Sequence, residues 1–232
     1  MMLPQIACIT FDLDDTLWHC APVIQQAEGI FYDWLTRHYP QVTARFTPDD
    51  LLQQRIGFSA QHPQLRHNLT RLRKAWLAEL AMRCHCDEGL VAQGFTVYWH
   101  ARNEVTLFDD VQQVLAALKQ QYVVGVITNG NANVERIGID HLFDFVVTSE
   151  AVGAAKPDPQ IFAAAVERAG VSLAQLLHVG DDPQGDVLGA MQAGARAAWV
   201  TSAPETWPYD LPPDLTVAHI RELATAIGPV QT

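Results

Sequence analysis

The segment Ile6–Leu17, IACITFDLDDTL, decides the fold, because an almost continuously apolar stretch runs directly into a group of aspartates. Its first half, residues 6–11, is partly β-branched and is typical of a central parallel strand covered on both faces. Carboxylates at the end of a buried strand repel one another and are costly to desolvate, so they need a cation, a lysine or a shared proton. The segment therefore predicts a functional site at a strand end. The alternative is that Asp14, Asp15 and Thr16 only form a turn and cap the next helix.

Composition limits the class of protein. The 232 residues suffice for one large domain, or for a core with a smaller inserted domain. Hydrophobic residues make up 49% and charged residues 18%, which indicates a globular rather than a disordered chain. The formal net charge of −11 argues against binding of nucleic acid or an anionic membrane. A phosphate-bearing substrate would therefore have to be met by local positive groups.

Targeting signals and metal-binding cysteines are not evident. No apolar stretch approaches the roughly 18 residues that span a bilayer, and residues 1–5 lack the basic and apolar regions of a signal peptide, so we expect a cytoplasmic protein. The four cysteines include Cys84 and Cys86, which flank His85. This cluster lacks the second pair of a zinc finger, so free thiols are the favoured interpretation over a metal site.

Residues 17–103 show helical patterns only. Thr47 followed by Pro48 and two acids predicts a capped helix start, and Gly57 is expected to end that helix. The expected helices are 22–38, 48–57, 63–83 and 87–100.

After this region strands and helices alternate. The expected strands are 122–128, 143–148, 176–179 and 197–201, and the expected helices are 109–120, 134–137, 159–169 and 185–193. Such alternation predicts a parallel sheet with right-handed crossovers. The fold class is therefore α/β, with a Rossmann-like parallel sheet core formed by residues 1–16 and 104–232 and an inserted all-helical cap formed by residues 17–103.

Polar residues follow strand after strand, and parallel strands open onto one edge of the sheet, where substrates bind. The residues concerned are Asp12, Asp14 and Thr16 after the first strand, Thr128, Asn129 and Gly130 after the second, Lys156 after the third, and Asp181, Asp182 and Asp186 after the fourth. Each group taken alone could be a turn, a helix cap or a solvated cation. Four groups in this order predict a shared site.

The chemistry that suits these side chains is phosphoryl transfer through an aspartyl phosphate, with Mg²⁺ as the cofactor. Asp12 would be nucleophile and metal ligand, and Asp14 would protonate the leaving alcohol and later take a proton from water. Thr128 and Lys156 would hold the transferring oxygens, together with the backbone N–H groups that follow Thr128. Asp181 would complete the metal ligands, and either Asp182 or Asp186 would orient the metal's waters.

The pattern resembles the haloacid dehalogenase superfamily over the core from residue 6 to about residue 201. FDLDDTL is similar to its first motif, ITNG to its second, Lys156 with Pro157 to its third and VGDDPQGDV to its fourth. The resemblance implies a phosphatase in which Mg²⁺ binds the Asp12 carboxylate, the Asp14 carbonyl and Asp181. Asn129 would help to bind the substrate phosphate, and Thr16 would lie around the metal ligands. An acid at position 14 favours a phosphatase over a dehalogenase.

A second resemblance concerns the substrate. ITNGNA at residues 127–132 and HVGDD at residues 178–182 are similar to a bacterial branch that hydrolyses flavin mononucleotide (FMN) and a phosphoribitylamino-uracil intermediate of riboflavin biosynthesis. The expected partner is thus a small phosphorylated metabolite, with no nucleic acid and no membrane, and the expected assembly is a monomer or homodimer.

The helical insertion offers candidate substrate contacts. It carries nine Lys and Arg against seven Asp and Glu, and several of its cations could meet a phosphate or form a solvated helix face. Its aromatic residues could stack on a flat ring, or form the insertion's core. Trp18 and His19 are better stacking candidates because they adjoin the acidic segment. The cations concerned are Arg66, Arg71, Arg73 and Lys74, and the aromatic residues are Phe31, Tyr32, Trp34, Trp76, Tyr98 and Trp99.

Three other functions remain open from the sequence. A sugar phosphomutase or another hydrolase of the same superfamily would share the motifs, and a phosphomutase would return phosphate to its substrate. A receiver-like, non-enzymatic signalling domain phosphorylated on aspartate would use a similar residue set. Such a domain has its aspartate after a strand that is not the first of the chain, and it has no large helical insertion. Here the acids follow the first strand and a helical insertion is expected, which disfavours this function.

Overall fold

The computed structural model describes residues 6–202 and 207–227. Residues 1–5, for which no signal peptide is expected, lie outside the described residues. The chain divides into two compact units. One, which we call the α/β unit, comprises the described residues of Met1–His19, Thr106–Gly130 and Val134–Thr232. The other, the helical unit, comprises Cys20–Val105 and Asn131–Asn133.

The α/β unit is built on a six-stranded parallel sheet with the order β3-β2-β1-β4-β5-β6. The predicted Rossmann-like α/β class is therefore confirmed. β1 lies in the interior of the sheet and is wholly buried, as its apolar sequence requires. The strands are β1 Cys8–Phe11, β2 Val123–Thr128, β3 Phe145–Thr148, β4 Leu176–Gly180, β5 Arg196–Val200 and β6 Leu215–Val217.

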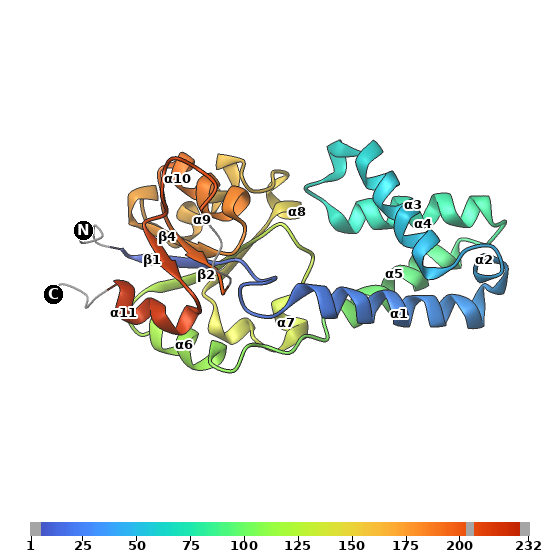
Figure 1. Ribbon diagram of the computed structural model, residues 1–232, viewed down its shortest axis with the longest axis horizontal. Coiled ribbons are helices and arrows are strands. Elements are labelled where there is room, and N and C mark those ends of the chain that lie inside the picture. Colours follow the sequence, from blue (N-terminus) through green and yellow to red (C-terminus); the bar gives the residue numbers. More distant parts are fainter. Residues whose placement is uncertain (1–5, 203–206, 228–232) are drawn as a thin grey trace. The chain divides into compact units, whose positions relative to one another are not determined.

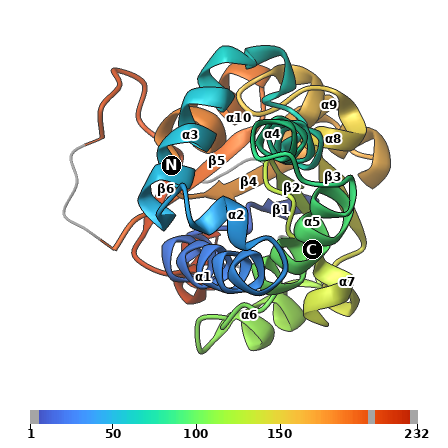
Figure 2. The ribbon, with the colours of Figure 1, turned by 90° about the vertical axis from the view of Figure 1, so that its right-hand side faces the viewer.

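Helices cover both faces of this sheet. Figures 1 and 2 show α9 and α10 on one face and α6 on the other. The α-helices of the unit are α6 Val111–Leu118, α7 Val134–Ile137, α8 Ser149–Val152, α9 Pro159–Ala169, α10 Gly189–Ala193 and α11 Leu223–Ile227. Short 3₁₀ turns are η2 Asp140–Leu142, η3 Leu173–Gln175 and η5 Ile220–Glu222, and η4 Pro183–Leu188 is a π-helical turn.

The helical unit contains no strand among its described residues, in agreement with the predicted all-helical insertion. Thr47 forms the expected capping box, because its Oγ1 accepts from Asp50 N at 3.2 Å while the Asp50 carboxylate accepts from Thr47 N at 2.9 Å. The elements are α1 Cys20–His38, α2 Pro40–Thr43, α3 Pro48–Gln61, η1 Pro63–Leu65, α4 Leu69–Arg83 and α5 Gly89–Arg102.

Two helix boundaries in this unit were predicted wrongly. Helix α3 does not end at Gly57 but continues to Gln61, because Phe58 packs into the core of the unit. That packing outweighs the cost of about 1 kcal/mol for a glycine inside a helix. The expected helix 63–83 is interrupted after η1, and α4 begins only after Asn68, whose Oδ1 accepts from Arg71 N at 2.7 Å. A side-chain cap therefore sets the new start.

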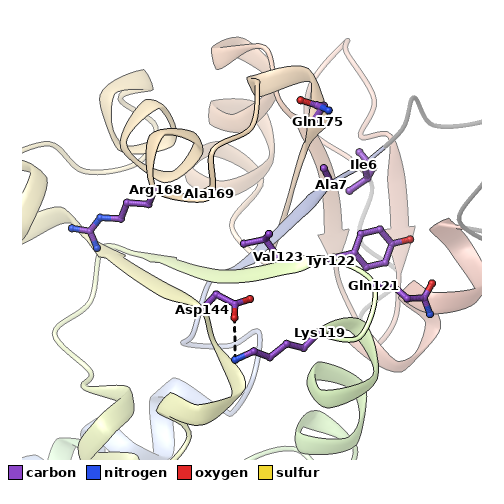
Figure 3. Close-up of a pocket in the computed structure, with 10 residues that line it drawn as sticks. All are labelled: Ile6, Ala7, Lys119, Gln121, Tyr122, Val123, Asp144, Arg168, Ala169 and Gln175. Atoms are coloured by element: carbon purple, nitrogen blue, oxygen red, sulfur yellow. Dashed lines mark ion pairs between the residues drawn. The ribbon is translucent and has the colours of Figure 1, made fainter.

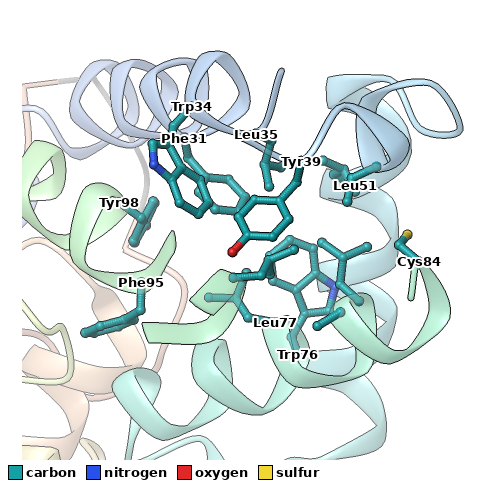
Figure 4. Close-up of a cluster of buried hydrophobic side chains, with 14 of the residues drawn as sticks. Phe31, Trp34, Leu35, Tyr39, Leu51, Trp76, Leu77, Cys84, Phe95 and Tyr98 are labelled. Atoms are coloured by element: carbon teal, nitrogen blue, oxygen red, sulfur yellow. The ribbon is translucent and has the colours of Figure 1, made fainter. Parts of the chain in front are cut away.

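The aromatic residues of the helical unit mainly form its core. Figure 4 shows Phe31, Trp34, Trp76 and Tyr98 within the buried cluster. Arg73 packs against this cluster and does not lie on a phosphate-binding or solvated face. Its side chain is 6% exposed, pairs with Glu28 through two hydrogen bonds of 2.8 Å, and places its guanidinium carbon 3.1 Å from the Tyr98 ring centroid. The alternative that these four aromatic residues form the core of the insertion is therefore correct, whereas neither interpretation considered for Arg73 holds.

Cys8, Cys20, Cys84 and Cys86 are all free thiols. Within residues 6–202 and 207–227, none of the helices combines the length and the apolar character that crossing a membrane requires.

Candidate active site

Strands β1, β2 and β4 place the predicted residues at the carboxyl edge of the sheet. Asp12 follows β1 directly, and its N–H donates to Val179 O of β4 at 2.9 Å. Thr128 is the last residue of β2, and Asp181 follows the last residue of β4. Neighbouring strands thus end side by side, which brings together residues more than a hundred positions apart in the chain.

Lys156 connects these strand ends. Its side chain is 3% exposed, and its Nζ lies 2.6 Å from Asp12 Oδ1 and 2.5 Å from Asp186 Oδ1. The same ammonium donates to Ile127 O of β2 at 2.9 Å. One buried cation is therefore shared by two carboxylates and a carbonyl, which offsets part of the charge that the aspartates bring into the site.

Asn129 fixes the backbone from which Lys156 extends. Its Oδ1 accepts from Lys156 N at 2.8 Å, and its Nδ2 donates to Lys156 O at 3.0 Å. Thr128 Oγ1 accepts from Gly130 N at 3.0 Å, which forms a tight turn after β2. The predicted phosphate-binding residues Thr128, Asn129 and Lys156 thus lie next to one another, and their phosphate-binding role stays a prediction.

Three carboxylates gather beside the lysine. One oxygen from each of Asp12, Asp181 and Asp186 lies within 4.8 Å of the other two. Thr16 Oγ1 donates to Asp181 Oδ1 at 3.1 Å, so the loop after β1 also helps to orient this cluster. Carboxylate oxygens at this spacing fit a hard divalent cation such as Mg²⁺.

Asp186, rather than Asp182, belongs to the carboxylate cluster. The Asp182 side chain is exposed and accepts from Gln184 N at 3.0 Å, as a cap of the π-helical turn η4. That turn buries Asp186, whose Oδ2 accepts from Asp182 N at 3.0 Å. The helix predicted for residues 185–193 is therefore α-helical only from Gly189, and π-helical turns often occur at functional sites.

His178 was not identified from the sequence, although it contacts the site. It is a buried residue of β4 whose Nε2 lies 3.1 Å from Asp186 Oδ1 and whose Nδ1 lies 2.9 Å from Thr10 Oγ1. Burial lowers the pKa of His178, so the neutral imidazole can donate from Nε2 and accept from the threonine hydroxyl. The sequence feature that could have identified His178 is its position inside the otherwise apolar strand LLHVG. Gly180 leaves the room that Asp186 needs, because a Cβ there would collide with its carboxylate.

The electrostatics of the cluster follow from burial and from the single lysine. Burial raises the pKa of Asp12 to about 8, although Lys156 opposes this rise and the negative Asp186 adds to it. Burial likewise raises the pKa of Asp181 to about 7, and Asp186 contributes in the same direction. Burial alone would raise the pKa of Asp186, but Lys156 and His178 hold it below its usual range. Asp186 is thus the carboxylate most strongly held in its charged form.

These shifts predict how stability depends on pH without divalent cations. A carboxyl group whose pKa is higher in the folded than in the unfolded protein contributes to stability. That contribution is complete below the pKa of the unfolded state and is lost as the pH rises through the pKa of the folded state. For Asp12 and Asp181 that loss is complete only above pH 7 to 8. We therefore expect the Tm in EDTA, measured by calorimetry, to fall between pH 5 and pH 9. Added Mg²⁺ should raise the Tm more at pH 8 than at pH 5, because binding requires ionised carboxylates.

Asp181→Asn is the control for this dependence, since it removes one of the two raised carboxylates without changing the size of the side chain. The variant should show a shallower fall of Tm with pH and a smaller stabilisation by Mg²⁺. A Tm in EDTA that is constant or rises over this range would contradict the assignment.

Asp14 and Trp18 lie in the turn after β1. The half-buried Asp14 accepts through Oδ1 from Trp18 Nε1 at 2.9 Å. Trp18 itself is fully buried, so it cannot stack on a substrate ring, and the sequence interpretation of this residue was wrong. His19 is exposed and packs edge-on against Phe108, with 4.6 Å between the ring centroids. The acid–base role of Asp14 and its carbonyl as a metal ligand stay predictions.

A pocket opens at the other edge of the sheet, where the strands begin. It has a volume of about 640 Å³ and contains none of the predicted site residues. Figure 3 shows Lys119 and Asp144 in its lining, with the ion pair between Lys119 Nζ and Asp144 Oδ1 at 3.2 Å. Its position away from the strand ends sets it apart from the carboxylate cluster.

The chain belongs to the haloacid dehalogenase-like hydrolase family, whose sequence model matches residues 6–194. It is therefore an enzyme of the hydrolase class, and the resemblance seen in its motifs is confirmed. It is 30% identical to the 5-amino-6-(5-phospho-D-ribitylamino)uracil phosphatase YigB of Escherichia coli strain K12, over 97% of this chain and 98% of that protein. It is also 34% identical to a phosphoserine phosphatase of Thermus thermophilus, over 56% of this chain and 54% of that protein.

The solved structures include a similar protein of a different stated activity. The crystal structure of a 2-haloacid dehalogenase from Pseudomonas syringae pv. Tomato DC3000 matches with a TM-score of 0.90 and 36% identity, over 96% of this chain and 98% of that one. The family and fold are thus shared with proteins described as phosphatases and as a dehalogenase. The choice between these reactions depends on the residues of the site.

Proposed function

We propose that this enzyme is a Mg²⁺-dependent phosphomonoesterase that forms an aspartyl phosphate on Asp12. The observation that supports this proposal most strongly is the position of the Asp12 carboxylate. It lies 2.6 Å from the Lys156 ammonium and beside the carboxylates of Asp181 and Asp186. A nucleophilic carboxylate needs positive charge next to it before an anionic phosphate can approach.

In the first step an Asp12 oxygen attacks phosphorus, and the bond between phosphorus and the ester oxygen breaks. Asp14 gives its proton to that leaving oxygen, so the product departs as an alcohol. In the second step Asp14 takes a proton from water, the water oxygen attacks phosphorus, and the bond to Asp12 breaks. Inorganic phosphate is released and both aspartates return to their starting states.

Lys156 and the turn after β2 hold the phosphate. The lysine ammonium lies between Asp12 and the end of β2, so it can bind oxygens of the group being transferred. The Thr128 hydroxyl and the backbone N–H groups that follow it are the other donors of this edge. Asp12, Asp181 and Asp186, with the Asp14 carbonyl, would hold Mg²⁺, which when bound neutralises charge on the transferring phosphate.

The proposed substrates are FMN or 5-amino-6-(5-phosphoribitylamino)uracil. The likeness to YigB along nearly the whole chain supports this choice. The likeness to a protein described as a 2-haloacid dehalogenase makes haloacid hydrolysis the competing activity. A halide leaves without a proton, so a dehalogenase does not need a proton donor at position 14. Asp14 therefore favours the phosphatase.

The deciding experiment measures release of inorganic phosphate from a panel of phosphorylated metabolites with Mg²⁺, including both proposed substrates. Many turnovers on one or more phosphomonoesters are expected, with activity lost in EDTA. Phosphate returned to the substrate would indicate a phosphomutase, a single turnover would indicate a receiver-like domain, and release of halide from a 2-haloacid without phosphate release would indicate a dehalogenase. Each of these three results would overturn the proposal.

A further inference from the structure

The indole of Trp18 makes a directional contact with the proposed acid–base residue. Trp18 Nε1 donates to Asp14 Oδ1 at 2.9 Å, and the Trp18 side chain is fully buried. The turn between them is closed by Asp15 N, which donates to Trp18 O at 2.8 Å. Asp15 itself adopts a φ of 57°, which brings the chain back so that residue 18 lies beside residue 14. The contact is therefore built into the loop that carries the catalytic aspartates.

An indole nitrogen can donate a hydrogen bond but cannot accept one. The Asp14 oxygen that faces it is therefore the acceptor of this contact. Because the carbonyl oxygen of a carboxyl group accepts a hydrogen bond better than its hydroxyl oxygen does, the contact favours the acid form that carries its proton on Oδ2. A carboxyl group whose proton can reside equally on either oxygen is only partly oriented for proton transfer, whereas this contact favours one of the two oxygens.

We propose that Trp18 is a positioning residue that orients the Asp14 carboxyl group so that it transfers its proton through Oδ2. The inference rests on the proposed function, because it assigns a role within the proposed phosphomonoesterase reaction. Trp18 touches no reacting atom. It acts by fixing the orientation of the carboxyl group that does, from a site where burial leaves the indole ring little freedom to move.

The chemistry of the leaving group separates this role from a merely structural one. An alkyl phosphate releases a poor leaving group that needs the Asp14 proton, whereas p-nitrophenyl phosphate releases a phenolate that leaves without it. The value of kcat/KM reports the step in which the ester bond breaks. A defect in proton donation should therefore lower kcat/KM for the alkyl ester far more than for the aryl ester.

The test variant is Trp18→Phe, which retains an aromatic ring in the buried position and removes the N–H. We expect kcat/KM to fall about tenfold on an alkyl phosphate such as FMN and less than about threefold on p-nitrophenyl phosphate. The tenfold loss is a part of the rate enhancement that a general acid–base group typically supplies. Equal losses on the two substrates, or no loss on the alkyl ester, would overturn the inference.

Trp199→Phe is the matched control. Trp199 is another buried tryptophan of the α/β unit, and its Nε1 donates to the Asp181 backbone carbonyl at 2.9 Å rather than to Asp14. Its loss should change kcat/KM by the same factor on both esters. If Trp18→Phe does not fold, as judged by its Tm, benzothienylalanine at position 18 keeps the shape of the indole and replaces the N–H with sulfur. For that variant too, a larger loss of kcat/KM on the alkyl ester supports the inference, and equal losses on both esters or no loss on the alkyl ester overturn it.

Failure of the inference can be distinguished from failure of the proposed function. A wild-type enzyme that releases no phosphate from either ester with Mg²⁺ present would refute the proposed function. A wild-type enzyme that hydrolyses both, with Trp18 variants that lose activity equally on both, would refute only the role of Trp18.

Discussion

Asp12→Asn is expected to reduce phosphate release by at least about 10⁴-fold at saturating Mg²⁺. The amide that replaces the carboxylate is neutral, so it is a poor nucleophile, and it no longer draws the Lys156 ammonium through an ion pair of 2.6 Å. The assay is the release of inorganic phosphate over many turnovers. The fold should be retained, because the substitution removes a buried carboxylate whose pKa is raised to about 8. At pH 8 in EDTA the Tm of the variant should therefore be no lower than that of the wild type.

Asp15→Asn is the control for this substitution. It makes the same chemical change in the same loop, at an exposed position outside the carboxylate cluster. Asn is well tolerated at the positive φ of this residue, so most of the activity should remain. Continued turnover by Asp12→Asn would contradict the assignment of the nucleophile, whatever the control shows.

Lys156→Met is expected to lower phosphate release by about 10³-fold, since it removes a preorganised donor from the place where negative charge develops. It should also destabilise the protein by about 3–5 kcal/mol, because the charged Asp186 and its neighbour Asp12 lose their shared buried cation. The free energy of unfolding from urea titrations measures the second effect. The loss should be larger at pH 8 than at pH 5, because at pH 5 Asp12 is protonated and less charge is left unpaired.

Lys119→Met provides the matched comparison for Lys156. Lys119 also forms an ion pair with an aspartate, Asp144, but it is 29% exposed and lies in the pocket at the other edge of the sheet. Its loss should cost no more than about 1 kcal/mol and leave activity unchanged. If Lys156→Met were as mild as Lys119→Met, Lys156 would be a surface-like cation and not part of the site.

The sheet and the position of the site could be predicted because their signals are local in sequence. Ile6–Leu17 combines an apolar strand with acids, and the later strands repeat that pattern, so their common edge follows from parallel topology. The missed strand β6, Leu215–Val217, has only three residues, which is too short for a periodic pattern.

Other features depend on contacts that the sequence does not encode locally. The burial of Trp18 depends on how its turn folds back toward Asp14, and the contact of His178 with Asp186 depends on a π-helical turn where an α-helix was expected. The choice between Asp182 and Asp186 had the same cause. The turn η4 carries Asp186 into contact with Lys156 and His178, whereas Asp182 lies before the turn and caps it.

The central place of β1 has a consequence for how the chain folds. β1 is made before its partner strands during synthesis, because these begin at Val123 and Leu176, beyond the Cys20–Val105 segment of the helical unit. Pairing must close a long loop on either side, and such distant pairings slow folding. Until β2 and β4 emerge from the ribosome, this strand, which is wholly buried in the folded protein, has two open edges. The nascent chain therefore passes through an aggregation-prone interval in which chaperone protection of β1 would matter most.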